Sequence, residues 1–132
     1  MLSKVYEDLY TELQAFIPEA RLIRDPLRTL AYGTDASFYR LIPKLVVRVN
    51  DEEDVRRTLK LARAHGTPVT FRAAGTSLSG QAITDSVLLV LGYEGWRQHR
   101  ISADAATISL QPGIIGAQEG RWDFYFALKA DY

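Results

Sequence analysis

A short loop rich in small residues and hydroxyls is the part of this sequence whose residue types could do chemistry. It runs from Arg72 to Gln81 and contains two glycines, two alanines and three hydroxyl side chains in ten residues. Glycine and alanine let a ligand approach the backbone closely, and successive free N–H groups in such a loop form a concave site for an anion. The hydroxyls of Thr76, Ser77 and Ser79 and the amide of Gln81 add further donors. These residues favour a diphosphate as the ligand.

Two better-known phosphate loops are excluded by their spacing. No Gly-Lys-Ser/Thr follows the glycines, so the loop is not of the Walker A type. The Gly-x-Gly-x-x-Gly spacing of the Rossmann dinucleotide fingerprint is also absent. Composition alone leaves a second interpretation open, a solvent-exposed loop that only connects two strands.

Composition limits the other chemistry. The 132 residues include no cysteine and only two histidines, which excludes thiol nucleophiles and disfavours a histidine-rich metal site. Sixteen basic residues balance sixteen acidic ones, which disfavours nucleic acid as the main partner. No apolar run approaches the ~20 residues of a membrane-spanning helix. Acidic residues interrupt the N-terminal stretch where a signal peptide would be apolar, so we expect a cytoplasmic protein.

A strand, a helix and a second strand precede the loop and would position it. β-branched residues predict a strand over residues 45–49. Asn50 would cap the following helix and Glu53 would complete a capping box. Gly66 would end that helix, and a second strand would begin at Val69. Two strands joined through a helix predict a parallel βαβ unit. The predicted apolar stripe of the helix comprises Val55, Leu59 and Ala62, with Leu61 beside it.

Further elements are expected on both sides of this unit. Apolar residues at spacings of four, four and three predict an amphipathic helix over residues 2–17. Residues 18–43 show no clear periodicity and would either contact a ligand or form a surface meander. Strands are predicted over residues 87–91 and 106–110. The predicted fold class is therefore α+β, a small and mainly parallel βαβ sheet flanked by helices.

These segments, taken in order, resemble the FAD-linked oxidase family. The sequence Tyr32-Gly33-Thr34-Asp35 precedes the first strand, and Pro68 to Gln81 includes the loop; the resemblance runs from about residue 20 to residue 118. Within the superfamily of vanillyl-alcohol oxidase and p-cresol methylhydroxylase, the likeness is strongest to the branch of the glycolate oxidase subunit and D-lactate dehydrogenase. The resemblance implies that residues 1–118 form the N-terminal part of an FAD-binding domain.

The resemblance also implies which residues contact FAD. Backbone N–H groups of residues 73–77 would face the pyrophosphate, and residues 80–81 would continue that contact. Arg72 would either reach a phosphate or remain a surface strand residue. Pro43 and residues 112–113 match positions near the adenine end, or they simply mark strand ends. No matched residue implies a catalytic role. The candidate cofactor-binding residues are Pro43, Arg72, Ala73, Ala74, Gly75, Thr76, Ser77, Ser79, Gly80, Gln81, Pro112 and Gly113.

The last residues depart from the family pattern. Residues 119–132 form an aromatic tail without a family counterpart, and the flavin-ring and substrate sites of relatives would lie beyond the matched part. We expect an FAD-binding subdomain of a flavin-dependent oxidoreductase acting on a 2-hydroxy acid such as glycolate or D-lactate, with weak or no FAD binding by this chain alone. The alternative is a truncated, non-catalytic domain that self-associates through residues 122–126. A module for another diphosphate nucleotide is a third option.

Overall fold

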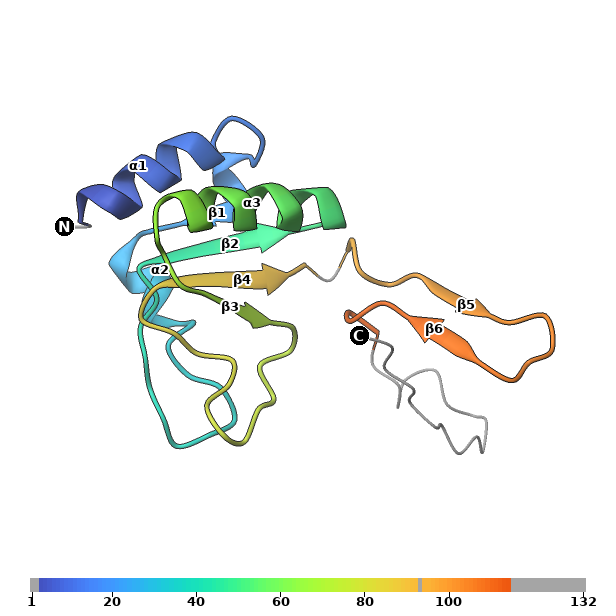
Figure 1. Ribbon diagram of the computed structural model, residues 1–132. Helices are drawn as coiled ribbons and strands as arrows, with labels where there is room; N and C mark the ends of the chain where they lie inside the picture. The colour runs from blue at the N-terminus through green and yellow to red at the C-terminus, as the bar shows by residue number, and fades with distance from the viewer. Residues whose placement is uncertain (1–2, 93, 115–132) are drawn as a thin grey trace.

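The structure, a computed structural model, describes residues 3–92 and 94–114 (Figure 1). Its strands are β1 (Leu22–Ile23), β2 (Leu45–Val49), β3 (Val69–Arg72), β4 (Val87–Leu91), β5 (His99–Ile101) and β6 (Ile108–Leu110). Its helices are α1 (Lys4–Leu13), the 3-10 turn η1 (Glu19–Arg21), α2 (Pro26–Leu30) and α3 (Glu52–Ala64). A four-stranded sheet has the order β1-β2-β4-β3, and the β5–β6 hairpin projects away from it. The predicted α+β class with a mainly parallel sheet is confirmed. Within the described ranges no helix has the length and apolar character needed to cross a bilayer.

The strand order differs from the simplest βαβ arrangement. β2 and β3, which are joined through α3, both run parallel to β4, and β4 lies between them. The prediction of parallel strands is confirmed, but β2 and β3 do not pair with each other. Because β3 and β4 are parallel, the loop after β3 starts at the carboxyl end of an edge strand and must return to the amino end of the central strand.

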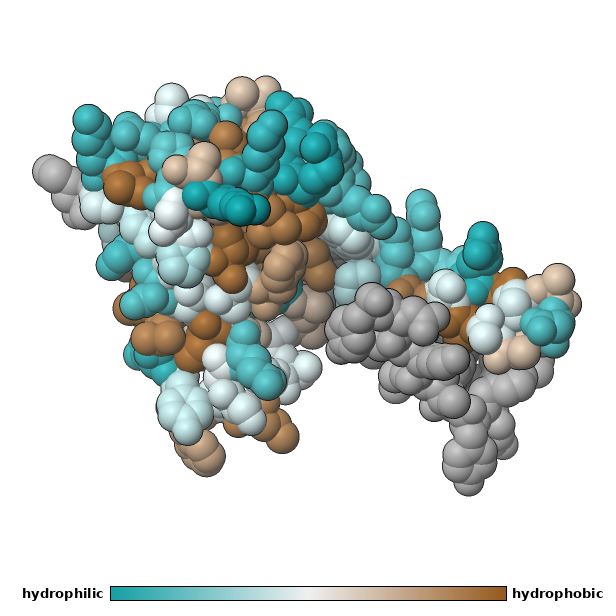
Figure 2. All heavy atoms as spheres, viewed as in Figure 1, coloured by the Kyte–Doolittle hydropathy of each residue, from teal (hydrophilic) through white to brown (hydrophobic). Residues whose placement is uncertain are grey.

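The main hydrophobic core lies between the sheet and the two longer helices. Figure 1 shows α1 and α3 on the same face of the sheet. Alternate residues of a strand point to the same face, and the core under these helices contains Leu9, Leu13, Leu45, Val47, Val49, Val87 and Leu89, all buried. The opposite face carries a smaller cluster of Ile23, Val46 and Leu88, with Tyr32 and Val90 half-buried against it. In the space-filling view, hydrophilic side chains cover the helical layer and hydrophobic ones gather beneath it (Figure 2).

The start of α3 differs from the prediction by one residue. Asp51, not Asn50, is the N-cap, and its carboxylate accepts a hydrogen bond from the Asp54 N–H at 2.8 Å. The Asp54 carboxylate in turn accepts from the Asn50 N–H at 3.1 Å. Only half of a capping box therefore forms at Asp51, because the Asp54 carboxylate reaches the N–H of Asn50, one residue before the N-cap, and Glu53 instead pairs with Arg56.

The predicted apolar stripe of α3 faces the core, where Ala62 is buried and Val55 and Leu61 pack half-buried, but Leu59 does not belong to it. Asp54, Thr58 and Ala62, spaced by four residues, are buried. Leu59, predicted in the apolar stripe, is 38% exposed. The end of the helix is as predicted, because Gly66 has a φ of +64° and the Thr67 N–H donates to the carbonyl of Ala62.

Two other predictions about the elements were wrong. The first helix ends at Leu13 and not at residue 17, because residues 14–16 already form a turn before Pro18. Residues 18–43 are not wholly irregular: they contain η1, α2 and β1, which pairs antiparallel with β2. These elements have two to five residues each, too few for a periodic pattern to show.

Candidate functional site

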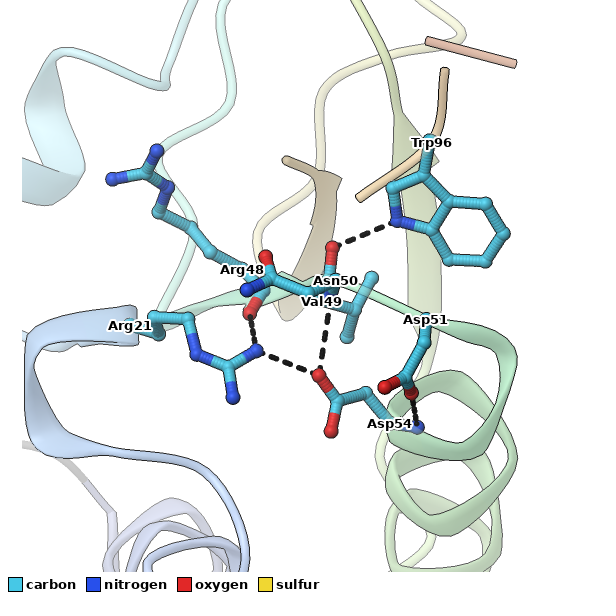
Figure 3. Close-up of polar contacts among 7 residues, drawn as sticks. All are labelled: Arg21, Arg48, Val49, Asn50, Asp51, Asp54 and Trp96. Carbon is cyan, nitrogen blue, oxygen red and sulfur yellow. Dashed lines mark hydrogen bonds and ion pairs between the residues drawn. The ribbon is translucent and has the colours of Figure 1, made fainter. Parts of the chain in front are cut away.

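The carboxyl end of β2 is fixed by polar contacts from three directions (Figure 3). The indole N–H of Trp96 donates to the carbonyl of Val49 at 2.9 Å, and Arg21 donates to the carbonyl of Arg48 at 3.2 Å. The same Arg21 guanidinium forms an ion pair with Asp54 at 2.6 Å. These contacts join η1, β2, α3 and the chain after β4 at one point and form a polar platform at the carboxyl end of β2.

The loop that follows β3 has the backbone conformation of an anion site. Gly75 and Gly80 have φ angles of +71° and +74°, which L-residues with side chains rarely adopt. The hydroxyl of Ser77 accepts hydrogen bonds from the N–H groups of Ser79 and Gln81, at 3.3 and 3.1 Å. It also donates to the side-chain carbonyl of Gln81 at 3.1 Å, so these two side chains hold the loop in shape.

A row of backbone N–H groups in this loop is available to a ligand. Within the described part of the chain, the N–H groups of residues 74–78 and of Gly80 donate to no protein acceptor. Ala74 and Thr76 are exposed, and Gly75 and Ser77 are half-buried. Successive free N–H groups next to a positive φ attract anions, because they concentrate positive partial charge. Within the described residues, the expected N–H donors of residues 74–77 and 80 are therefore free, whereas the Gln81 N–H and the Ser77 hydroxyl are used inside the loop.

A hollow of about 230 Å³ lies beside this loop, at the carboxyl ends of β2, β3 and β4. Crevices at the carboxyl ends of parallel strands are where open α/β sheets bind ligands. The lining contains two cations, which suit an anionic ligand. Its residues are Tyr32, Arg48, Arg72, Ala73, Ala74, Val90, Leu91 and Gly92.

Arg72 connects the loop to the segment before β2. Its Nη1 donates to the carbonyl of Thr34 at 2.7 Å and to that of Tyr32 at 3.3 Å. A Cβ atom at position 75 would lie 2.5 Å from the Arg72 guanidinium, so a side chain there would have to displace that guanidinium. Arg72 is therefore more than a surface strand residue: it ties two segments of the site together.

Asp35 is a site residue to which the sequence assigned no role. Its carboxylate accepts hydrogen bonds from the N–H and hydroxyl of Ser37 and from the N–H of Ala82. The Ser37 hydroxyl is the main reason that the pKa of Asp35 lies below its ordinary value, and the nearby Arg72 acts in the same direction. An Asp two residues before a Ser is a signal for a turn closed by the carboxylate, and this signal could have indicated the contact.

The remaining candidates do not line the hollow beside the loop. Pro43 is buried just before β2, at the amino end of the sheet, and lines a second hollow with residues of α1 and α2. Gly113 donates its N–H to the carbonyl of Trp96, and Pro112 beside it is exposed. The contacts of Pro43, Pro112 and Gly113 with a cofactor stay predictions. Within residues 3–92 and 94–114, no group of three acidic, histidine or cysteine side chains could hold a metal ion.

Residues 43–122 match the family model described as FAD binding domain. The glycolate oxidase subunit GlcD of Bacillus subtilis (strain 168) is 30% identical over 88 residues, which are 65% of this chain and 19% of that protein. The chain thus spans about a fifth of the length of this curated relative. The aromatic residues 122–126, and the tail from residue 119 of which they are part, lie outside the described residues, so the domain boundary and self-association there stay predictions.

Solved structures share this fold. An alkyldihydroxyacetonephosphate synthase superposes with a TM-score of 0.71 and 20% identity, over 86% of this chain and 24% of that chain. p-Cresol methylhydroxylase with substrate bound superposes with a TM-score of 0.65 and 14% identity, over 76% of this chain and 21% of that chain. 4-Ethylphenol oxidase from Gulosibacter chungangensis superposes with a TM-score of 0.65 and 18% identity, over 85% of this chain and 23% of that chain. The resemblance to FAD-linked oxidases is confirmed.

Proposed function

This chain belongs to the family of FAD-binding domains, and from that membership we propose that residues 73–77 and 80–81 bind the pyrophosphate of FAD. The observation that carries the proposal is the row of N–H groups at residues 74–78, which find no acceptor in the part of the chain that the structure describes. A diphosphate brings several acceptor oxygens within the length of such a row, and each N–H in it is a donor to an anion.

The charges around the loop support the same ligand. Residues 72–81 contain no acidic side chain, and both Arg48 and Arg72 line the adjoining hollow. Arg72 already donates to two backbone carbonyls, so its part would be mainly electrostatic and structural. Arg48 is exposed on β2, and its charge faces the solvent where an anion would approach.

We further propose that the chain serves a flavin-dependent oxidoreductase acting on a 2-hydroxy acid such as glycolate or D-lactate. The 30% identity to a glycolate oxidase subunit supports this substrate class. FAD, when bound, supplies the hydride acceptor for such an oxidation. The residues described here would bind and orient the diphosphate end, and they include no group assigned to the substrate. The cytoplasmic location expected from the sequence stays a prediction.

Titration of the chain with FAD tests the cofactor proposal. We expect weak but saturable quenching of flavin fluorescence that ADP and inorganic pyrophosphate reverse and riboflavin does not, because the proposed contacts are to the diphosphate. Absence of quenching at high micromolar FAD, or competition by riboflavin alone, would contradict it.

A pair of glycine variants tests whether the loop is the site. Gly75→Ala and Gly66→Ala both place a side chain at a positive φ, at a cost of about 1–2 kcal/mol each. At position 66 nothing lies within 4 Å of the added Cβ, whereas at position 75 it meets the Arg72 guanidinium. We expect FAD affinity to fall about tenfold in Gly75→Ala and to stay unchanged in Gly66→Ala. Equal affinities would place the diphosphate elsewhere.

A further inference from the structure

We propose that Asp35 is a positioning residue for the diphosphate loop, which it fixes from a segment about 40 residues earlier in the chain. The inference rests on the proposed function, because it concerns how the same loop is held ready for FAD. It concerns Asp35, Ser37 and Ala82, none of which is among the candidate cofactor-binding residues. Asp35 itself would not touch the cofactor.

The carboxylate of Asp35 joins the two segments. Oδ1 accepts from the Ser37 N–H at 2.8 Å and from the Ser37 hydroxyl, which closes a turn within residues 35–37. Oδ2 accepts from the Ala82 N–H at 3.4 Å, at the point where the loop ends and the chain becomes buried. One side chain therefore fixes both the shape of its own turn and the far end of the loop.

Other contacts fix the near end of the loop against the same segment. The Ala36 N–H donates to the carbonyl of Gly75 at 3.1 Å, and Arg72 donates to the carbonyl of Thr34 at 2.7 Å. With the Gly75 carbonyl turned toward Ala36, a peptide plane at the centre of the loop has a fixed orientation. A Cβ atom at Gly80 would lie 2.9 Å from the Tyr39 ring, so the segment also packs closely under the second glycine. The direction of the free N–H groups is therefore set by residues 34–39.

Removing the charge of Asp35 distinguishes a positioning role from a purely electrostatic effect on FAD binding. A carboxylate close to a diphosphate repels it, so removing the Asp35 charge should strengthen FAD binding if charge alone mattered. If Asp35 orients the loop, its neutralisation should weaken binding, because an asparagine keeps one acceptor oxygen and presents N–H groups to the donor on its other side. The two effects act in opposite directions, so one measurement distinguishes them.

The test compares Asp35→Asn with Asp85→Asn. Asp85 ends the same connection between β3 and β4, is exposed, and forms no hydrogen bond or ion pair within the described residues. We expect Asp35→Asn to lower the affinity for FAD and for pyrophosphate alike, by about tenfold. Asp85→Asn, which removes the same charge, should leave both affinities unchanged or slightly raise them. Equal or tighter binding by Asp35→Asn would overturn the positioning role.

Amide hydrogen exchange decides the matter without ligand. The Ala82 and Ser37 amides should exchange faster in Asp35→Asn than in the wild-type chain, and unchanged exchange would overturn the proposal.

If the wild-type chain does not bind FAD, the proposed function fails, while the exchange data still test the positioning role. If Asp35→Asn does not fold, Ser37→Ala removes one donor and should weaken FAD binding about threefold. Unchanged affinity in Ser37→Ala would then count against the role of Asp35.

Discussion

Neutralising Asp54 should destabilise the fold much more than neutralising its neighbour Glu53. Both carboxylates lie in the first turn of α3, and each accepts from an arginine at 2.6 Å. The side chains of Asp54 and Arg21 are 12% and 22% exposed, whereas those of Glu53 and Arg56 are 57% and 67% exposed. Water screens the exposed pair and leaves it little net energy. Asp54 also accepts from the Asn50 N–H, so its carboxylate completes a network that the solvent cannot replace.

The size of the effect follows from these contacts. A hydrogen bond to a charged group contributes about 1.5–3 kcal/mol. Asp54→Asn replaces the charged acceptor of the Arg21 hydrogen bond with a neutral one, and it leaves the Arg21 guanidinium without a counter-charge. We expect its free energy of unfolding to fall by about 2 kcal/mol, which for a domain of this size corresponds to about 7 °C in melting temperature. Glu53→Gln loses the same interaction with the helix dipole, so the difference between the two variants reports the buried ion pair together with the hydrogen bond from Asn50.

Urea and thermal unfolding followed by far-ultraviolet circular dichroism provide the measurement. Glu53→Gln should melt close to the wild-type chain, and Asp54→Asn clearly below it. FAD affinity of folded Asp54→Asn should be unchanged at low temperature, because the cluster supports the platform and does not contact the loop. If the two variants lose equal stability, burial does not decide the strength of these ion pairs and the reasoning is wrong.

Two further predictions concern the buried hydroxyl of Thr58 and the carboxyl groups of Asp35 and Asp104. The hydroxyl of Thr58 is buried without a hydrogen-bond partner among the described residues, so Thr58→Val should raise the free energy of unfolding by about 1 kcal/mol; a loss of stability in urea unfolding would show that the hydroxyl has a partner. In an NMR pH titration, the carboxyl groups of Asp35 and Asp104 should both titrate below 3.8, because serine hydroxyls donate to their charged forms. Their contribution to stability is complete above 3.8 and lost as the pH falls through the lower folded pKa values, and a midpoint at or above 3.8 would contradict this.

The central strands could be predicted from the sequence because burial on both faces leaves a distinct pattern. β2 and β4 are nearly continuous apolar runs, and the predicted bounds agree with the structure. α3 ends where Gly66 indicates, since a positive φ favours glycine. Strand order was harder to infer, because a βαβ pattern predicts direction and not which strand lies between the two. β1, with two residues, carries no pattern of its own.

The capping error shows how close alternatives compete at a helix start. Asn50 and Asp51 are both good N-caps, and each has an acidic residue three positions later. The choice depends on tertiary contacts, because a start at Asp51 brings Asp54 to Arg21 and to the end of β2. Local propensity could not include an arginine 33 residues away.

In the candidate site, too, some features follow from the local sequence and others depend on residues far away in the chain. The donors were predictable, because they are backbone N–H groups in a loop whose small side chains leave them accessible. Their orientation was not, because it depends on Asp35 reaching Ala82 and on Arg72 reaching Thr34, contacts that span 47 and 38 residues. Residue types alone therefore indicate the ligand class and the loop but not Asp35, whose substitution we expect to weaken binding about tenfold. A segment without periodicity, such as residues 18–43, can therefore supply an acceptor that holds a ligand-binding loop in place without touching the ligand.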